Sequence, residues 1–187
     1  NYDMGYQSAK YIIEKAGPAA HIAVLDVPSS GSVCVLRKQG FYDYLKEVGY
    51  DTSNIQEFQL ESFARADGQT AAADILEKMP QIDAFYSMDD ETSIGTILAM
   101  KEANRMECKA ITGGGGCQEY FKIIASEEGK AIGAASALYS PAMIQDAIKV
   151  AIKVLNGEEA PAETIIPTTI VSAENVDQHL DPSNNVY

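Results

Sequence analysis

Residues 21–49 read HIAVLDVPSSGSVCVLRKQGFYDYLKEVG and place a strand, a loop and a helix in close succession. The first five residues, HIAVL, form a short apolar run that is typical of a strand buried on both faces of a sheet. Residues 26–32 are rich in Pro, Ser and Gly and indicate a loop. A helix is expected from Val33 to Val48, and Gly49 marks its end.

The same alternation of apolar β-prone runs and helical patterns continues along the whole chain. Strands are expected over 21–25, 55–60, 84–88, 109–112, 131–138 and 164–171, and helices over 4–15, 33–48, 68–78, from Asp90 or Glu91 onward, 119–126 and 141–155. Pro167 places the last strand at an edge of the sheet, or leaves it only partly paired. Short connections between alternating elements predict an α/β fold of three layers: a mostly parallel, flavodoxin-like sheet with helices on both faces.

Composition narrows the class of protein. The chain has 187 residues and a formal net charge of −13, which argues against a nucleic-acid partner and against an anionic membrane surface. The hydrophobic fraction of 46% fits a folded domain, and no stretch approaches the ~18 apolar residues of a membrane-spanning helix. Three cysteines without a CxxC pattern predict neither a disulfide framework nor a metal site. No cofactor is expected.

Ligands of open parallel sheets bind outside the carboxyl ends of the strands. This rule selects five loops, over residues 26–32, 61–67, 88–91, 113–118 and 137–140. They contain no nucleophile elbow, no Walker loop and no histidine, since the two histidines, His21 and His179, lie elsewhere. Without a base, a nucleophile and an oxyanion site, the chain is not expected to be an enzyme.

Two of these loops contain residues that invite a chemical interpretation. The four glycines 113–116 resemble a phosphate-binding loop, but they lack the surrounding motif, so a tight strand-to-helix turn is the favoured interpretation. Asp89 and Asp90 look like an acid pair, yet adjacent residues of an extended chain point in opposite directions. Asp90 is therefore expected to cap a helix. Whether Asp89 points into the ligand crevice is left open by the sequence.

Serines and one aromatic residue complete the candidates. Of the loop residues Ser29, Ser30 and Ser32, one is expected to cap the following helix, which leaves the others for a ligand. Phe63 lies in a polar loop after a strand. Its ring is either a lid over the local core or a plate on which a ligand ring stacks, and these residues alone leave both alternatives open.

Four motifs occur in an order that is specific as a set. They are RKQGF at 37–41, the segment 82–95 that begins IDAF and continues through DDE, KVLNGE at 153–158, and the closing segment 169–177. In this order and spacing the chain resembles the periplasmic sugar-binding proteins of ABC transporters, of the ribose-binding type (type I periplasmic binding proteins). The resemblance covers essentially the whole chain.

The resemblance implies a role and a division of the chain. Proteins of this family close two lobes around a small ligand, usually a sugar, and deliver it to a membrane permease. Residues 1–138 would then be the C-terminal lobe, 139–158 a helix that packs on an N-terminal lobe missing from this chain, and 159–187 a final strand and polar tail. The implied location is extracytoplasmic, in the periplasm or as a cell-surface lipoprotein.

The family's ligand positions are only partly kept. Phe63 matches the aromatic residue that stacks on the sugar, and Asp89 falls where the family has a sugar-binding Asn. Gly114 replaces a usual Asp, Leu138 (or Ala137) a usual Gln, and Val35 a usual Arg. The candidate ligand-binding residues are Phe63, Asp89, Ser30, Ser32, Gly114 and Leu138. With fewer polar groups and an acidic crevice, the expected ligand is an unusual sugar or a cationic or partly apolar solute.

Two further expectations follow. The same fold also serves as the effector domain of lac-repressor-type regulators or as the sensor of a receptor, and a helix-turn-helix or membrane segment outside this chain would distinguish these alternatives. Residues 141–155 form an amphipathic helix whose apolar face must be buried. We expect this face to fold back on its own lobe or to pack against a second copy in a dimer.

Overall fold

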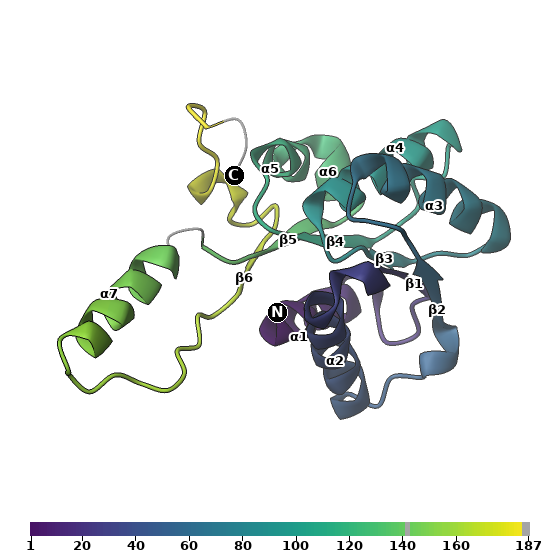
Figure 1. The fold of residues 1–187 in the computed structure, drawn as a ribbon. Helices are drawn as coiled ribbons and strands as arrows, with labels where there is room; N and C mark the ends of the chain where they lie inside the picture. The colour runs from purple at the N-terminus through teal and green to yellow at the C-terminus, as the bar shows by residue number, and fades with distance from the viewer. Residues whose placement is uncertain (141–142, 185–187) are drawn as a thin grey trace.

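The computed structural model describes residues 1–140 and 143–184 and contains one six-stranded sheet in the order β2-β1-β3-β4-β5-β6. The strands are β1 (Ile22–Asp26), β2 (Ile55–Gln59), β3 (Ala84–Tyr86), β4 (Ala110–Gly114), β5 (Ala134–Leu138) and β6 (Thr169–Val171). The first five run parallel, and β6 pairs antiparallel with β5 at one edge (Figure 1). The mostly parallel sheet and its edge strand are confirmed.

Helices cover both faces of the sheet. They are α1 (Tyr2–Ala16), α2 (Ser32–Glu47), α3 (Arg65–Lys78), α4 (Asp90–Glu102), α5 (Gln118–Ala125), α6 (Glu127–Ala131) and α7 (Met143–Leu155). Helices α1 and α2 lie on one face, and α3 to α6 lie on the other (Figure 1). The predicted three-layer α/β class is therefore confirmed, although the strand expected from residue 131 begins only at Ala134, because the short helix α6 ends at Ala131.

Helices cross each other closely on both faces of the sheet, and glycine permits this. A Cβ atom on Gly5 of α1 would lie 1.8 Å from a backbone oxygen of α2, and one on Gly40 would lie 2.0 Å from a backbone oxygen of α1. On the other face, a Cβ on Gly95 of α4 would lie 2.1 Å from a backbone oxygen of α3. Close backbone packing of this kind fixes the position of α2 against α1 and of α4 against α3.

The core lies between these layers. Every residue of β1, β3 and β4 is buried, as the uninterrupted apolar runs predict, whereas β2 at the opposite edge is half exposed. Phe41 of α2 stacks on Tyr86 of β3, with ring centroids 4.3 Å apart and an interplanar angle of 6°. Aromatic packing of this kind joins α2 to the central strands.

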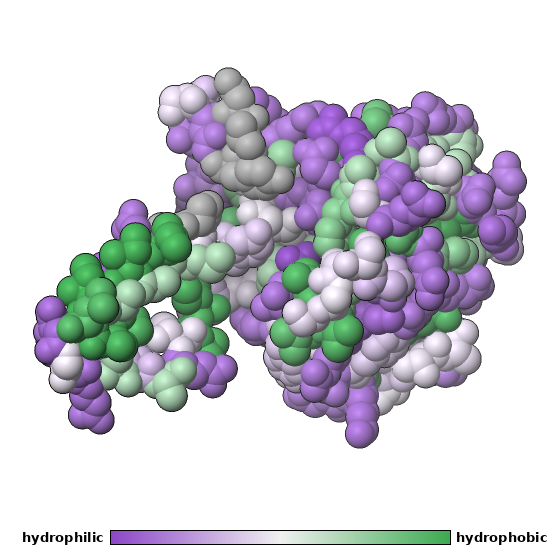
Figure 2. Space-filling model, in the orientation of Figure 1, coloured by the Kyte–Doolittle hydropathy of each residue, from purple (hydrophilic) through white to green (hydrophobic). Residues whose placement is uncertain are grey.

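Helix α7 departs from the expectation stated for residues 141–155. None of its residues is buried, and its exposed large apolar side chains have exposed fractions from 40% for Met143 to 85% for Leu155. Figure 2 shows them as an apolar surface on a helix that stands apart from the lobe. The prediction that this face folds back on its own lobe is wrong, because the chain leaves the sheet after β5 and returns to it only at β6. Pro141 lies outside the described residues, and packing against a second copy stays a prediction.

Candidate ligand-binding site

The carboxyl ends of neighbouring strands bring three of the predicted residues to one edge of the sheet. Strand β4 lies between β3 and β5, and Gly114 at its end is in register with Ala137 of β5. Asp89 follows β3, and Leu138 is the last residue of β5. Asp89, Gly114 and Leu138 therefore sit at consecutive strand ends, where ligands of parallel sheets bind.

Asp89 caps helix α4 with its carboxylate. Its Oδ1 accepts a hydrogen bond from the backbone N–H of Glu91 at 2.9 Å, and Asp89 is partly buried. Burial raises the pKa of Asp89, and the N–H of Glu91 and the charge of Arg37 oppose this rise. The sequence assigned the cap to Asp90, and this was wrong by one residue: Asp89 is the N-cap, and Asp90 is the first residue of the helix.

Asp90 turns away from its own helix and toward the glycine loop. Its side chain is buried, and Oδ2 accepts hydrogen bonds from the backbone N–H groups of Gly116 and Cys117, both at 2.8 Å, and from Oγ of Ser136 at 2.9 Å. Burial raises the pKa of Asp90 to about 7 despite these donors. The pair thus has divided roles, because Asp89 holds α4 while Asp90 joins α4 to the ends of β4 and β5.

The glycine run 113–116 leaves space for the carboxylate of Asp90 and donates a hydrogen bond to it. A Cβ atom on Gly113 would lie 2.3 Å from Oδ1 of Asp90, so a side chain there would displace the carboxylate. Gly115 and Gly116 adopt positive φ angles of 125° and 97° in the turn that follows β4. Because the N–H of Gly116 already donates to Asp90, the run is a strand-to-helix turn, as the sequence favoured, and not an open phosphate loop.

Gly114 offers only its backbone to a ligand. A Cβ on Gly114 would lie 2.8 Å from the carbonyl oxygen of Met88 and 2.8 Å from Cε of Met4. The position therefore has no room for the Asp that the resemblance associates with it, unless these neighbours move. A ligand contact at Gly114 stays a prediction and would have to involve its main chain.

Phe63 and Arg37 are in contact beside this edge. Cζ of Arg37 lies 5.8 Å from the centroid of the Phe63 ring, and the Arg37 guanidinium donates to the carbonyl oxygen of Met88. Met88 has a φ of 64°, which is unusual for a residue other than glycine, so the bond from Arg37 holds a strained turn. Arg37 is buried and stabilises the β3–α4 turn through this hydrogen bond to Met88.

The Phe63 ring is partly buried and partly open. It packs against the core, and the Phe63 carbonyl oxygen accepts a hydrogen bond from Oγ1 of Thr92 in α4 at 3.0 Å. The two alternatives for this ring, core lid and stacking plate, are therefore compatible, since one side covers Arg37 while part of the ring stays accessible. Its contact with a ligand stays a prediction.

The two serines differ in availability. Oγ of Ser30 donates to the carbonyl oxygen of Val27 at 2.7 Å and accepts from the N–H of Cys34 at 3.3 Å, so Ser30 ties its own loop to α2. Ser32 is the first residue of α2 and is exposed. Leu138 is partly exposed. Of these candidates, Ser32 and Leu138 have accessible side chains, and their roles stay predictions.

An ion-pair network at the same edge was not predicted. Nε of Arg65, the first residue of α3, lies 3.0 Å from Glu91 of α4, and its Nη2 lies 2.8 Å from Glu119 of α5. The bond from Arg65 lowers the pKa of Glu119. No local spacing in the sequence shows that one guanidinium bridges the first turns of two later helices.

This pairing leaves less negative charge at the edge than the composition suggests. Oδ2 of Asp26, which ends β1, lies 2.7 Å from Nζ of Lys38, and the single charge of Arg65 offsets one of the two charges of Glu91 and Glu119. Within residues 1–140 and 143–184, no group of three or more His, Cys, Asp or Glu residues is placed to hold a metal ion. The described helices also include none long and apolar enough to cross a membrane.

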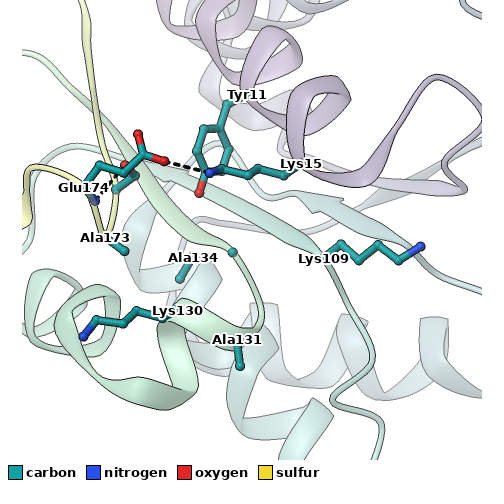
Figure 3. Close-up of a pocket in the computed structure, with 10 residues that line it drawn as sticks. Tyr11, Lys15, Lys109, Lys130, Ala131, Ala134, Ala173 and Glu174 are labelled. Carbon is teal, nitrogen blue, oxygen red and sulfur yellow. Dashed lines mark hydrogen bonds and ion pairs between the residues drawn. The ribbon is translucent and has the colours of Figure 1, made fainter.

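A cavity of about 270 Å³ lies near the amino ends of β4 and β5, opposite the carboxyl ends where the predicted ligand residues lie (Figure 3). It is lined in part by Tyr11 and by three lysines, and Lys109 and Lys130 point away from each other. Each ammonium group has a carboxylate partner: Lys15 with Glu174, Lys109 with Asp83 and Lys130 with Glu127. This cavity therefore does not form a convergent anion site and is distinct from the predicted ligand edge.

Comparison with known sequences agrees with this geometry. Residues 1–159 match the family described as periplasmic binding protein domain. The ribose import binding protein of Salmonella typhimurium is 26% identical over 168 residues, which are 89% of this chain and 54% of that protein. This chain spans about half the length of the curated relatives that it matches.

Solved structures show the same fold. An ABC transporter solute-binding protein from Mycobacterium smegmatis with bound glycerol is 26% identical, with a TM-score of 0.80 over 100% of this chain and 64% of that one. A periplasmic solute-binding protein from Actinobacillus succinogenes with bound D-allose has a TM-score of 0.82 at 20% identity, over 95% of this chain and 62% of that one. These are binding proteins and not enzymes, as the sequence predicts. The chain belongs to the periplasmic binding protein domain family.

Proposed function

We propose that this chain forms one lobe of an extracytoplasmic solute-binding protein, which captures a sugar or polyol in a cleft between two lobes and delivers it to an ABC permease. Family membership and the match to about half of a ribose import binding protein support this proposal. The relatives with bound glycerol and D-allose indicate the chemical class, a small polyhydroxylated solute.

The observation that carries the proposal is the convergence of Phe63, Asp89 and Leu138 on the carboxyl edge of the sheet. A partly exposed ring offers a face to the C–H groups of a sugar. The carboxylate of Asp89, at the end of β3, can accept hydrogen bonds from hydroxyl groups. The partly exposed Leu138 adds apolar contact, so a solute with one polar and one less polar side fits this lobe.

We propose that the chain is divided as the resemblance implies. Residues 1–138 would be the lobe, 139–158 a helix that packs on the partner lobe, and 159–187 the final strand and tail. The open apolar face of α7 supports this division, because a face of this kind needs a partner. Ligand binding would shift the population from open to closed lobes around a hinge, without covalent chemistry.

A thermal-shift screen of the full-length protein tests the ligand. The probes are D-ribose, D-allose, myo-inositol, glycerol, adenosine and spermidine, each at millimolar concentration. We expect a sugar or polyol to raise the melting temperature, since a ligand that binds only the folded state stabilises it. Phe63→Ala should abolish this shift, whereas Phe58→Ala, a partly buried aromatic on edge strand β2, should lower stability and keep it.

The other outcomes distinguish other functions. Stabilisation by spermidine alone, lost in Asp89→Asn, would replace a sugar by a cationic solute. Stabilisation by none of the probes would contradict the transport proposal. A sugar that binds but is not taken up by cells in a manner dependent on this protein would favour a sensor or regulator that uses the same cleft.

A further inference from the structure

The buried carboxylate of Asp90 connects three strand ends through one oxygen atom. Its Oδ2 accepts from Gly116 and Cys117 in the turn after β4, at 2.8 Å each, and from Ser136 in β5 at 2.9 Å. Asp90 itself directly follows Asp89 after β3. The three elements that these bonds join are the ones that carry Asp89, Gly114 and Leu138.

The second oxygen of this carboxylate is unusual. Oδ1 of Asp90 is buried and has no hydrogen-bond partner among the described residues. It occupies the space that the missing side chain of Gly113 leaves. A buried oxygen without a hydrogen-bond partner costs free energy when it carries charge. Protonation of the carboxylate at Oδ1 removes this cost.

The groups that face Asp90 are acidic or neutral. Asp89 on the same turn raises the pKa of Asp90, and the Cys117 thiol and the Tyr120 phenol lie close enough for Asp90 to raise theirs. Burial raises the pKa of both latter groups further, so they stay neutral near pH 7. Burial thus raises the pKa of Asp90 to about 7, where Cys117 and Tyr120 are neutral.

We propose that Asp90 is a positioning residue of the ligand cleft, whose ionised carboxylate holds the ends of β3, β4 and β5 in the arrangement that presents Asp89, Gly114 and Leu138 to a ligand. The inference rests on the proposed function of this edge. Burial favours the protonated form of Asp90, but the three donors favour the ionised form. Hydrogen bonds to an ionised acceptor are roughly twice as strong as neutral ones, so protonation relieves the cost of burial and loosens these three contacts. Affinity for a sugar should then increase as the pH rises through neutrality.

A pH titration of backbone amides tests the hydrogen bonds to the Asp90 carboxylate without any ligand. In ¹H–¹⁵N spectra of the full-length protein between pH 5.5 and 8.5, the amides of Gly116, Cys117 and Leu138 should shift with one common midpoint near 7. Asp90→Asn, which keeps the shape and removes the ionisation, should abolish this titration. Its survival in Asp90→Asn, or its absence from the natural protein, would overturn the inference.

Two more variants keep the test decisive. Ser136→Ala removes a donor that favours the ionised form, so the midpoint should rise, and an unchanged midpoint would contradict the contact. Asp89→Asn removes the neighbouring charge but none of the donors to Asp90, so the amides of Gly116 and Cys117 should still titrate, with a lower midpoint. Loss of their titration in Asp89→Asn would assign it to Asp89 and overturn the inference.

Affinity measurements separate this inference from the proposed function. The dissociation constants of D-ribose and D-allose, measured calorimetrically from pH 5.5 to 8.5, should fall by roughly threefold or more in the natural protein and stay constant in Asp90→Asn. Titrating amides with a pH-independent affinity would overturn the positioning role. Titrating amides without binding of either sugar would contradict the sugar ligand and leave the contact between the three strand ends established.

Discussion

The lobe (residues 1–138) and helix α7 (Met143–Leu155) both contain large apolar side chains, but their surroundings are opposite. In the lobe, Leu45 is completely buried in the core, whereas Leu155 at the end of α7 is 85% exposed. The same residue type therefore stabilises the fold in one region and contributes nothing in the other. The difference teaches that periodicity predicts which face of a helix is apolar, but the partner that covers this face depends on the rest of the protein.

The largest expected effect compares these two leucines directly. Leu45→Ala should lower the free energy of unfolding by about 3 kcal/mol, because it leaves a cavity in a packed core. Leu155→Ala should change it by less than about 0.5 kcal/mol in the chain of residues 1–187. Urea denaturation of both variants measures the difference. Equal losses would show that α7 is packed against something within this chain.

A second test concerns the helix crossings of the lobe. Gly95→Ala should cost about 2 kcal/mol, because a Cβ atom would press into the backbone of α3. Ala66→Ser, at an exposed position of α3, is the control and should stay within about 0.5 kcal/mol of the natural chain. Thermal unfolding followed by circular dichroism compares the two, and a neutral Gly95→Ala would mean that the helices can separate at little cost.

A third test uses two buried carboxylates with opposite pKa shifts. Burial alone would raise the pKa of Asp83, but the backbone N–H of His21 and the ammonium of Lys109 lower it to about 2. Asp83 therefore stabilises the fold above its unfolded-state pKa of 3.8, and this contribution is lost as the pH falls toward 2. Burial raises the pKa of Asp90 to about 7, so its contribution is present below 3.8 and is lost as the pH rises through 7.

The two corresponding variants should therefore change opposite limbs of the pH–stability curve. Asp83→Asn should flatten the loss between pH 4 and pH 2, and Asp90→Asn the loss between pH 4 and pH 7. Each effect should be about 2 kcal/mol or more, because a pKa shift of one unit corresponds to about 1.4 kcal/mol. Urea midpoints measured at intervals of one pH unit give both limbs. The same limb changing in both variants would contradict the assignment.

The smallest expected effect in this chain is on α7. Ile148→Glu should leave the stability of residues 1–187 almost unchanged, since Ile148 is 53% exposed. In the full-length protein the same change should destabilise, because a charge would enter the interface that we propose between α7 and the partner lobe. Parallel thermal melts of both proteins test this. Destabilisation of residues 1–187 alone, with a change from dimer to monomer on sedimentation, would instead support packing against a second copy.

Much of the fold follows from local pattern, because buried parallel strands such as residues 22–26 are continuous apolar runs. The loops at the ligand edge follow from topology. What could not be read locally are the contacts that cross the sheet: the carboxylate of Asp90 on Gly116, and Arg65 between Glu91 and Glu119. These bonds join residues 26 or more positions apart, and sequence spacing does not report which way such side chains turn.

A crystal structure of the full-length protein, grown with the sugar that gives the largest thermal shift, tests the central claim most directly. We predict that the sugar ring lies against the Phe63 ring, with a hydroxyl group within hydrogen-bond distance of the Asp89 carboxylate, and that α7 packs on the other lobe. A sugar bound instead in the cavity beside Tyr11 and Lys15, or without contact to Phe63 and Asp89, would contradict the assignment of the ligand site to the carboxyl edge of the sheet.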